Sequence, residues 1–301
     1  MSGQSGRRTV VVTGATGLLG RALCERFAAR GDAVRALVRL VDAAALPASV
    51  AVFEGRLPGA IDGRAFAGAD VVVHAAYSTR SRDAGEDRRT NIDGTRAVLA
   101  ASRAAGVRRF VFVSSTSAHA DALALYGQGK LMLEREMDPS RDLVIRPGLI
   151  LARQGGLFAR MLGSIRRTGV VPLFGGGRQT IQTVHIDDLV EAFVQAVDLD
   201  LRGTLTIAEP KGLLMREFFR LMAAAVGRRC VLVPVPFGPA LLALRGAERL
   251  GVRLPVSSQN LLGLKGLRFM ESASSLERVG VEARTARESL ESLLGRAPAP
   301  G

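Results

Sequence analysis

The first half of the chain alternates short apolar, β-branched runs with stretches whose apolar residues recur at helical spacing. The apolar runs predict strands at residues 9–13, 33–38, 50–53, 71–74, 109–114 and 143–146. The helical spacing predicts helices at residues 18–30, 92–105 and 127–137. Strands that alternate with helices are typical of an α/β domain, in which a doubly wound parallel sheet is covered on both faces.

After Pro147 the pattern changes to helices with little strand, which indicates a smaller, mostly helical C-terminal substrate domain. The predicted helices cover residues 157–167, 186–197, 215–226, 239–250, 257–264 and 286–294. A short strand predicted at 204–207 could rejoin the main sheet. We therefore expect a flexible tail at 1–8, a dinucleotide-binding domain of the Rossmann type at 9–150, and a substrate-side region at 151–296.

The composition is that of a globular protein that buries a full core, because 48% of the 301 residues are hydrophobic. The two cysteines, Cys24 and Cys230, are far apart and lack metal-ligand neighbours, which favours a reducing cytoplasm over a disulfide framework. The start has no signal-peptide pattern. The longest uncharged apolar stretch, 230–244, contains three prolines and is shorter than the roughly 18–20 residues of a membrane span. We expect no membrane partner.

The formal net charge of +13 raises the question of nucleic-acid binding. The basic residues are almost all arginines, since Lys130, Lys211 and Lys265 are the only lysines, and they are spread along the chain without long runs. Few aromatic residues are available to stack on bases. The pattern therefore predicts no nucleic-acid partner. It is consistent with an anionic cofactor. We expect a small-molecule substrate and a monomer or homodimer.

A glycine-rich turn directly follows the first predicted strand and leads into a helix. It reads Thr13-Gly-Ala-Thr-Gly-Leu-Leu-Gly20. Such glycines permit a tight turn and bring backbone N–H groups close to a pyrophosphate, whose charge the helix N-terminus favours. This turn predicts a dinucleotide site that includes Gly14, Thr16, Gly17, Leu18 and Leu19.

The end of the second strand indicates which dinucleotide is bound. An NAD enzyme usually carries an acidic residue about 20 residues beyond the fingerprint. This chain has Arg39 near that position, and a guanidinium can bind a 2′-phosphate. We expect NADP(H) to be preferred, with NAD(H) possible; a surface arginine without a ligand is the alternative interpretation.

Tyr126 and Lys130 place a phenol and an ammonium one helical turn apart on the same face. An ammonium ~4 Å from the phenol, at an effective dielectric of ~20, contributes ~4 kcal/mol, or about three pKa units. We expect this charge to bring the pKa of Tyr126 near neutrality, so that it exchanges a proton with a substrate oxygen. Glycines at 127 and 129 are expected to loosen the start of this helix, each by up to ~1 kcal/mol relative to alanine.

These motifs and their order over residues 9–190 resemble the extended short-chain dehydrogenase/reductase family, which is NAD-dependent epimerase/dehydratase-like. The TGxxGxxG spacing is typical of that family. The resemblance implies a catalytic set of Ser115, Tyr126 and Lys130, with Ser114, Thr116 and Ser117 as alternatives for the serine. His74 is then a packing residue, and Asn91 either supports the cofactor and lysine or caps a helix. The further cofactor contacts that the resemblance implies are Leu57, Ala75, Ala76, Val113, Tyr126, Lys130, Pro147 and Gly148.

The function implied by the resemblance is NADP(H)-dependent oxidoreduction, in which a ketone, aldehyde or alcohol of a mid-sized, partly apolar metabolite exchanges a hydride with the nicotinamide. A nucleotide-sugar epimerase is one alternative, although only ten residues separate Ser115 from Tyr126 and sugar-nucleotide members usually have a longer segment. A non-enzymatic NADP(H)-binding sensor or assembly subunit is the other. Dehydration is disfavoured because Thr116 and Ser117 stand where dehydratases have an Asp-Glu pair.

Overall fold

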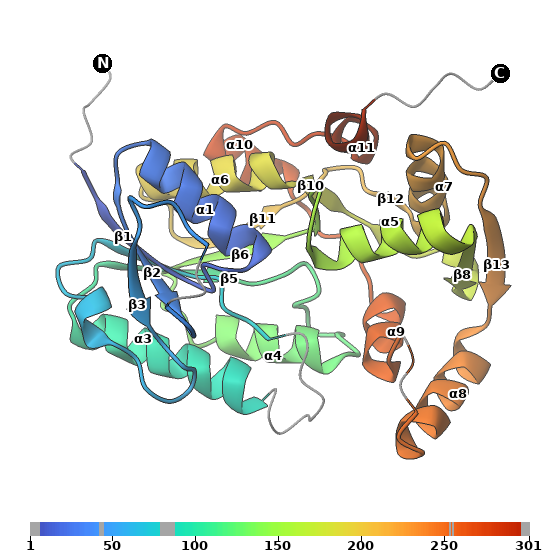
Figure 1. Cartoon of the computed structure of the whole chain (residues 1–301), viewed down its shortest axis with the longest axis horizontal. Coiled ribbons are helices and arrows are strands. Elements are labelled where there is room, and N and C mark those ends of the chain that lie inside the picture. The colour runs from blue at the N-terminus through green and yellow to red at the C-terminus, as the bar shows by residue number, and fades with distance from the viewer. Residues whose placement is uncertain (1–6, 42–44, 79–87, 253, 255, 296–301) are drawn as a thin grey trace. The chain divides into compact units, whose positions relative to one another are not determined.

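The computed structural model describes residues 7–41, 45–78, 88–252, 254 and 256–295. The chain forms two compact units, each built from separate stretches of sequence (Figure 1). Unit 1 contains residues 1–114, 132–145 and 190–205, and unit 2 contains residues 115–131, 146–189 and 206–301. Residues 1–6 of the expected N-terminal tail lie outside the described residues.

A seven-stranded sheet forms the centre of unit 1, in the order β11-β6-β5-β4-β1-β2-β3. The pairs that join β1 to β6 are parallel. The strand order reverses at β1, as in a doubly wound sheet, where ligands bind beyond the carboxyl ends of the strands. This order confirms the predicted α/β fold. The strand predicted near 204–207 joins the main sheet as β11. The strands are β1 Thr9–Thr13, β2 Ala33–Val38, β3 Ala51–Glu54, β4 Val71–His74, β5 Arg109–Val113, β6 Leu143–Pro147 and β11 Gly203–Ile207.

Helices cover both faces of this sheet. Figure 1 shows α1 (Leu18–Ala29) and α6 (Ile186–Asp198) on one face and α3 (Gly94–Ala104) on the other, together with residues 132–134 of α4 (Leu125–Glu134), the part of that helix that belongs to unit 1. The β-branched strands are almost entirely buried, since they face helices on both sides. The core beneath α3 and α4 contains Val11, Val72, Phe110, Phe112 and Leu133.

The region after Pro147 is mostly helical, as predicted, but unit 2 also contains short strands that the sequence pattern did not predict. Among its described residues, three two-stranded pairs occur: β7 Leu149–Leu151 with β10 Thr183–His185, β9 Thr180–Ile181 with β12 Leu213–Leu214, and β8 Val170–Phe174 with β13 Val231–Val235. The helices are α5 Gly156–Thr168, α7 Met215–Ala225, α8 Phe237–Arg249, α9 Ser258–Lys265, α10 Ala273–Val279 and α11 Ala286–Leu294. An apolar core joins α5, α7 and α11 through Leu151, Phe158, Phe218 and Leu290.

Two helices of the first half of the chain have other bounds than predicted. The helix expected from residue 92 begins with a π-helical turn, Arg88–Asp93, and becomes α-helical only at Gly94. The helix expected at 127–137 occupies Leu125–Glu134, so Tyr126 lies in its first turn. The short helix α10 was not predicted.

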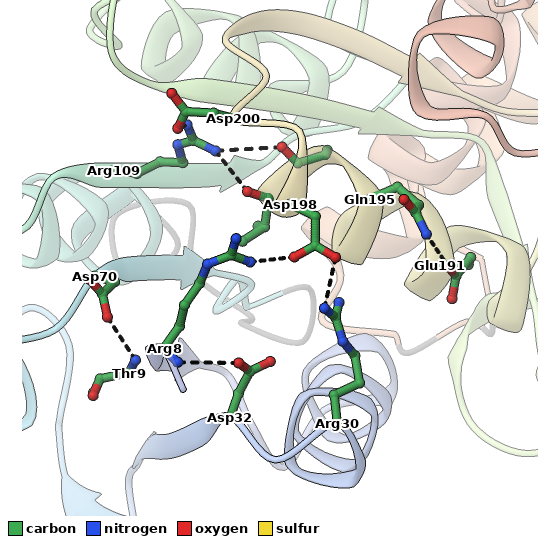
Figure 2. A network of polar contacts seen from close by, with 12 residues as sticks. Arg8, Thr9, Arg30, Asp32, Asp70, Arg109, Glu191, Gln195, Asp198 and Asp200 are labelled. Atoms are coloured by element: carbon green, nitrogen blue, oxygen red, sulfur yellow. Dashed lines mark hydrogen bonds and ion pairs between the residues drawn. The ribbon is translucent and has the colours of Figure 1, made fainter. Parts of the chain in front are cut away.

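An ion-pair network lies at the amino-terminal ends of β1 and β5 (Figure 2). Arg8, which precedes β1, pairs with Asp198 at the end of α6, and Arg30 at the end of α1 pairs with the same carboxylate at 2.7 Å. Arg109, at the start of β5, is buried and pairs with Asp200. Arg109 also donates to two carbonyl oxygens near the end of α6. The network joins segments nearly two hundred residues apart.

Both cysteines are free thiols. Burial raises the pKa of the Cys24 thiol to about 12, so it stays protonated at neutral pH. Within the described ranges, every helix is too short or too polar to cross a membrane.

Candidate active site

The glycine-rich turn of unit 1 has no room for side chains at two of its glycines. Gly14 has a φ of +66°, and a Cβ there would lie 2.7 Å from the amide nitrogen of Ala76 and 2.8 Å from the carbonyl carbon of Ala75. A Cβ at Gly20 would lie 2.2 Å from the carbonyl oxygen of Gly14. The turn therefore packs backbone against backbone beside Ala75 and Ala76. This geometry fits the close approach of a dinucleotide pyrophosphate.

The helix that follows the turn begins without a side-chain cap. Its N-cap is Gly17, no side-chain hydrogen bond caps it among the described residues, and its first turn contains no acidic residue. The Gly17 amide donates to the Gly14 carbonyl at 2.9 Å and closes the turn. Thr16 and Gly17 are exposed, whereas Leu19 is buried. Uncapped N–H groups at a helix N-terminus favour an anion, so the fit to a phosphate is good.

Arg39, the predicted 2′-phosphate ligand, is exposed just after β2 and has no ion-pair partner among the described residues. Arg56 differs, because its guanidinium pairs with Glu54 at 2.9 Å. Leu57 packs against the start of α3, where a Cβ at Gly94 would lie 2.8 Å from the Cβ of Leu57. Of the two arginines, only Arg39 keeps its charge unpaired within the described part of the chain.

A buried chain of hydrogen bonds supports the glycine-rich turn. The Thr13 hydroxyl lies 2.8 Å from His74 Nδ1, and His74 Nε2 lies 2.9 Å from the Thr95 hydroxyl, which donates to the Asn91 carbonyl. The Ala76 amide donates to Thr13 Oγ1 at 3.2 Å. His74 is 1% exposed, so its side chain packs in the core as predicted. Its two hydrogen bonds were not anticipated; they require the partners that only the folded chain supplies.

Asn91 fixes the strand-to-helix connection. Its side chain accepts from the Ser78 amide at 2.6 Å and donates to the Ser78 carbonyl at 2.8 Å. The N-cap of α3 is Asp93, so the alternative in which Asn91 caps that helix was wrong. The two bonds hold the segment that leaves β4 after Ala75 and Ala76.

The catalytic set predicted from the sequence lies in unit 2. The Ser115 and Tyr126 side chains are hydrogen-bonded to each other. Ser115 Oγ accepts from the Ser117 amide at 3.1 Å, which leaves the Ser115 hydroxyl hydrogen free to be directed at the phenol oxygen. Lys130 is 3% exposed, one turn further along α4. The structure therefore brings the serine and the tyrosine together and buries the lysine on the same helix.

The pKa of Tyr126 is raised above its usual value of about 10, which is opposite to the direction expected from Lys130. Burial of the phenol is the larger cause of this shift, although 36% of the residue's surface is exposed. The hydrogen bond with Ser115 lowers the pKa in part. The phenol therefore stays protonated at neutral pH and is set up as a proton donor.

The neighbouring serines and Thr116 have other partners. The Ser114 hydroxyl donates to Glu134, and the Thr116 amide donates to the Pro147 carbonyl at 3.0 Å. The Ser117 carbonyl oxygen would lie only 2.2 Å from a Cβ at Gly127. Gly127 thus permits the loop after Ser115 to lie directly against the first turn of α4, a reason for the glycine that the sequence did not reveal.

The remaining predicted cofactor residues lie at strand ends. Val113 is 8% exposed at the end of β5, and Pro147 is buried at the end of β6. Gly148 is buried where a Cβ would lie 2.5 Å from the Gln182 carbonyl oxygen, so backbone packing requires glycine there whatever its role toward a cofactor.

A buried polar cluster in unit 2 was missed by the sequence analysis. His185 Nδ1 accepts from the Asp187 amide at 3.2 Å and lies 2.8 Å from an Arg284 guanidinium nitrogen. Asp188 accepts from the Arg284 amide at 2.9 Å, so it holds the segment before α11. Asp187 and Asp188 both lie in the first turn of α6, where their charge favours the helix N-terminus. The cluster could not be found from local spacing, because Arg284 is nearly a hundred residues away.

Comparison with known proteins identifies reductases among the relatives. The model of the NAD dependent epimerase/dehydratase family matches residues 10–141. A 4-hydroxy-2-methyl-3-oxo-4-farnesyl-3,4-dihydroquinoline-1-oxide ketoreductase of Stigmatella aurantiaca is 31% identical over 274 residues, which cover 81% of this chain and 79% of that protein. A ceramide reductase of Caulobacter vibrioides is 31% identical over 239 residues, covering 76% and 74%.

Solved structures show the same fold at lower identity. MoeE5 in complex with UDP-glucuronic acid and NAD superposes with a TM-score of 0.74 at 21% identity, covering 95% of this chain and 97% of that one. Human epimerase family protein SDR39U1 with NADPH gives a TM-score of 0.72 at 20% identity, covering 95% and 99%. These likenesses establish the fold alone. The family model and the identity and coverage of the two reductases show that the chain belongs to the NAD-dependent epimerase/dehydratase family of extended short-chain dehydrogenases/reductases.

Proposed function

We propose that this protein is an NADPH-dependent reductase that converts a ketone or aldehyde to the alcohol. The observation that carries the proposal is the hydrogen bond between Ser115 and a Tyr126 phenol whose pKa is raised. Reduction of a carbonyl needs a proton donor at the carbonyl oxygen, whereas oxidation of an alcohol needs a base there. A phenol that retains its proton at neutral pH suits reduction.

Each member of the set has a distinct role in this proposal. Tyr126 donates its proton to the carbonyl oxygen, and the Ser115 hydroxyl donates a hydrogen bond to the same oxygen and orients it. The Ser117 amide fixes the Ser115 oxygen and so its direction. Lys130, buried on α4, contributes a positive charge that favours the phenolate left after proton donation.

The cofactor supplies the hydride when it is bound. The main chain of Gly14 and Gly17 would hold its pyrophosphate, because the turn is formed by glycine backbone and leads into an uncapped helix N-terminus. Arg39 would hold the 2′-phosphate, which favours NADPH over NADH. The two relatives named as reductases support the direction of the reaction. The proposal places the enzyme in the cytoplasm, as a monomer or homodimer.

Substitution of Tyr126 by phenylalanine tests the proposal. We expect Tyr126→Phe to abolish carbonyl-dependent NADPH consumption while NADPH binding, measured by calorimetry, is retained. Tyr77→Phe is the matched control, because Tyr77 is the other tyrosine of the chain. Unchanged turnover in Tyr126→Phe would refute the role of the phenol. Inversion of a UDP-hexose without net consumption of NADPH would refute the reductase and favour an epimerase.

A further inference from the structure

Two stretches of unit 2 carry nearly all of the net charge of the protein. Residues 151–186 and 218–270 contain thirteen basic residues and one acidic residue, Glu248, so together they carry a charge of +12, against +13 for the whole chain. Basic residues are about as dense here as elsewhere, and it is the acidic residues that are missing. The Glu248 carboxylate accepts from the Ser258 amide at 2.6 Å and from the Ser258 hydroxyl at 2.7 Å. A surface formed by these stretches therefore favours a polyanionic partner.

The strands β8 and β13, one in each stretch, form a parallel ribbon whose outer face is apolar. Val170 lies beside Val231, and Pro172 lies beside Val233. Because side chains alternate along a strand, these four residues share one face, and all four are exposed. The opposite face packs into the core of unit 2 through Val171. Exposed apolar residues are common one at a time, but a group of neighbours indicates an interaction surface.

Four arginines lie at the end of the ribbon where both strands begin. Arg166 and Arg167 are in the last turn of α5, before β8, and Arg228 and Arg229 precede β13. The two pairs are adjacent, since the Arg228 guanidinium donates to the Arg166 carbonyl oxygen at 2.5 Å. All four are exposed, and none has an ion-pair partner within the described ranges. Their charges are therefore available to an anion.

Helix α8, which follows β13, has the same combination of side chains. Leu242 is 76% exposed, and Arg245 and Arg249 are exposed three and seven residues further on. This spacing places the three side chains on one side of the helix. Figure 1 shows β13 leading directly into α8. The mixture of apolar and basic groups therefore continues beyond the ribbon.

We propose that the ribbon and its four arginines dock on the surface of an anionic phospholipid membrane. Such a surface buries apolar side chains at the boundary of the acyl chains and attracts guanidinium groups to its phosphates. A second copy of the chain would bring four more arginines against these four, and nucleic acid would gain nothing from valine and proline side chains. The expectation of no membrane partner rested on the lack of a spanning segment, which a peripheral contact does not need.

Binding to lipid vesicles tests the proposal and needs no catalytic turnover. We expect the protein to sediment with vesicles of phosphatidylcholine and phosphatidylglycerol in equal parts, and to stay in solution with phosphatidylcholine alone. Arg167→Gln and Arg229→Gln should each weaken binding about fivefold, the contribution of one arginine at an anionic surface. Arg135→Gln is the matched control, because Arg135 is an exposed arginine of unit 1, and its binding should be nearly unchanged.

The apolar part of the surface is tested by a second pair of variants. We expect the double variant Val231→Ser/Val233→Ser to weaken vesicle binding about tenfold, whereas Leu199→Ser, at a residue of unit 1 that is 54% exposed, should not weaken it. If the double variant fails to fold, as judged by its thermal transition, Val170→Ser replaces it.

Three results would overturn the proposal. The first is the absence of binding to the anionic vesicles, or equal binding by the ribbon variants and their controls. The second is binding to duplex DNA but not to vesicles, which would favour a nucleic-acid partner. The third is a dimer that the double variant converts to a monomer, which would make the ribbon an interface between two copies of the chain.

Discussion

Replacement of Gly127 by alanine sets a gain in helix propensity against a steric clash. Alanine stabilises a helix interior by ~1 kcal/mol relative to glycine. At this position, however, the new Cβ would lie 2.2 Å from the Ser117 carbonyl oxygen and 3.0 Å from the Ala122 Cβ. Relief of such a contact requires backbone movement, which costs about 1–3 kcal/mol or more. We therefore expect net destabilisation of up to about 2 kcal/mol in Gly127→Ala.

The same movement should reduce catalysis, because Ser117 positions Ser115 through its amide. A displacement of about 1 Å in a reacting group can lower the rate about 100-fold. Calorimetric melting and kcat for carbonyl reduction check both effects. Gly163→Ala is the matched control, since nothing lies within 4 Å of a Cβ at that helical glycine, and it should be stabilised. If Gly127→Ala melts above the wild type and keeps its kcat, the close approach of Ser117 to α4 is not a constraint.

Three further predictions follow from the site. The raised pKa of Tyr126 means that its proton is lost only above about pH 10, so kcat/KM for reduction should stay level from pH 6 to 9; a fall near pH 7 would contradict the pKa direction. Arg39→Ala should shrink the NADPH-over-NADH preference, measured by calorimetry, by about 10- to 100-fold, whereas the ion-paired Arg56, changed to alanine, should have little effect. Asn91→Ala removes both hydrogen bonds to Ser78 and should lower the free energy of unfolding by about 1–3 kcal/mol. An unchanged melting temperature would exclude a structural role for the contact between Asn91 and Ser78.

The sheet of unit 1 could be predicted from the sequence because β1, β2, β4 and β5 are short, mostly apolar runs without proline or glycine, of which β1 and β4 consist almost wholly of β-branched residues. Strands β1, β2 and β4 begin and end where the pattern predicts. Strands β8 and β13 in unit 2 were missed, since Pro172 and Pro234 interrupt them and a proline argues against a central strand. In the described part of the chain, β8 and β13 form a sheet of two strands. Each strand therefore has a neighbour on one side alone, and its proline does not need to donate a hydrogen bond to a strand on the other side.

The candidate site was predictable where it depends on local spacing and not where it depends on distant partners. Tyr126 and Lys130 share a helix, and their spacing alone places them on one face. The pKa of Tyr126 was predicted in the wrong direction, because the burial of its phenol depends on packing that spacing does not encode. The role of Gly127 likewise requires the position of the Ser117 carbonyl oxygen.

The ion pairs at the amino edge of the sheet also have a consequence for biosynthesis. Arg8 and Arg30 leave the ribosome early, but Asp198 and the edge strand β11 follow only after residues 115–131 and 146–189 of unit 2 have been made. Domains otherwise tend to fold in order during synthesis, N-terminal part first. Until residues 190–205 have been synthesised, the side chains of Arg8 and Arg30 and one edge of the sheet therefore stay unpaired. A nascent chain stalled before that point exposes a strand edge open to chaperones or to aggregation.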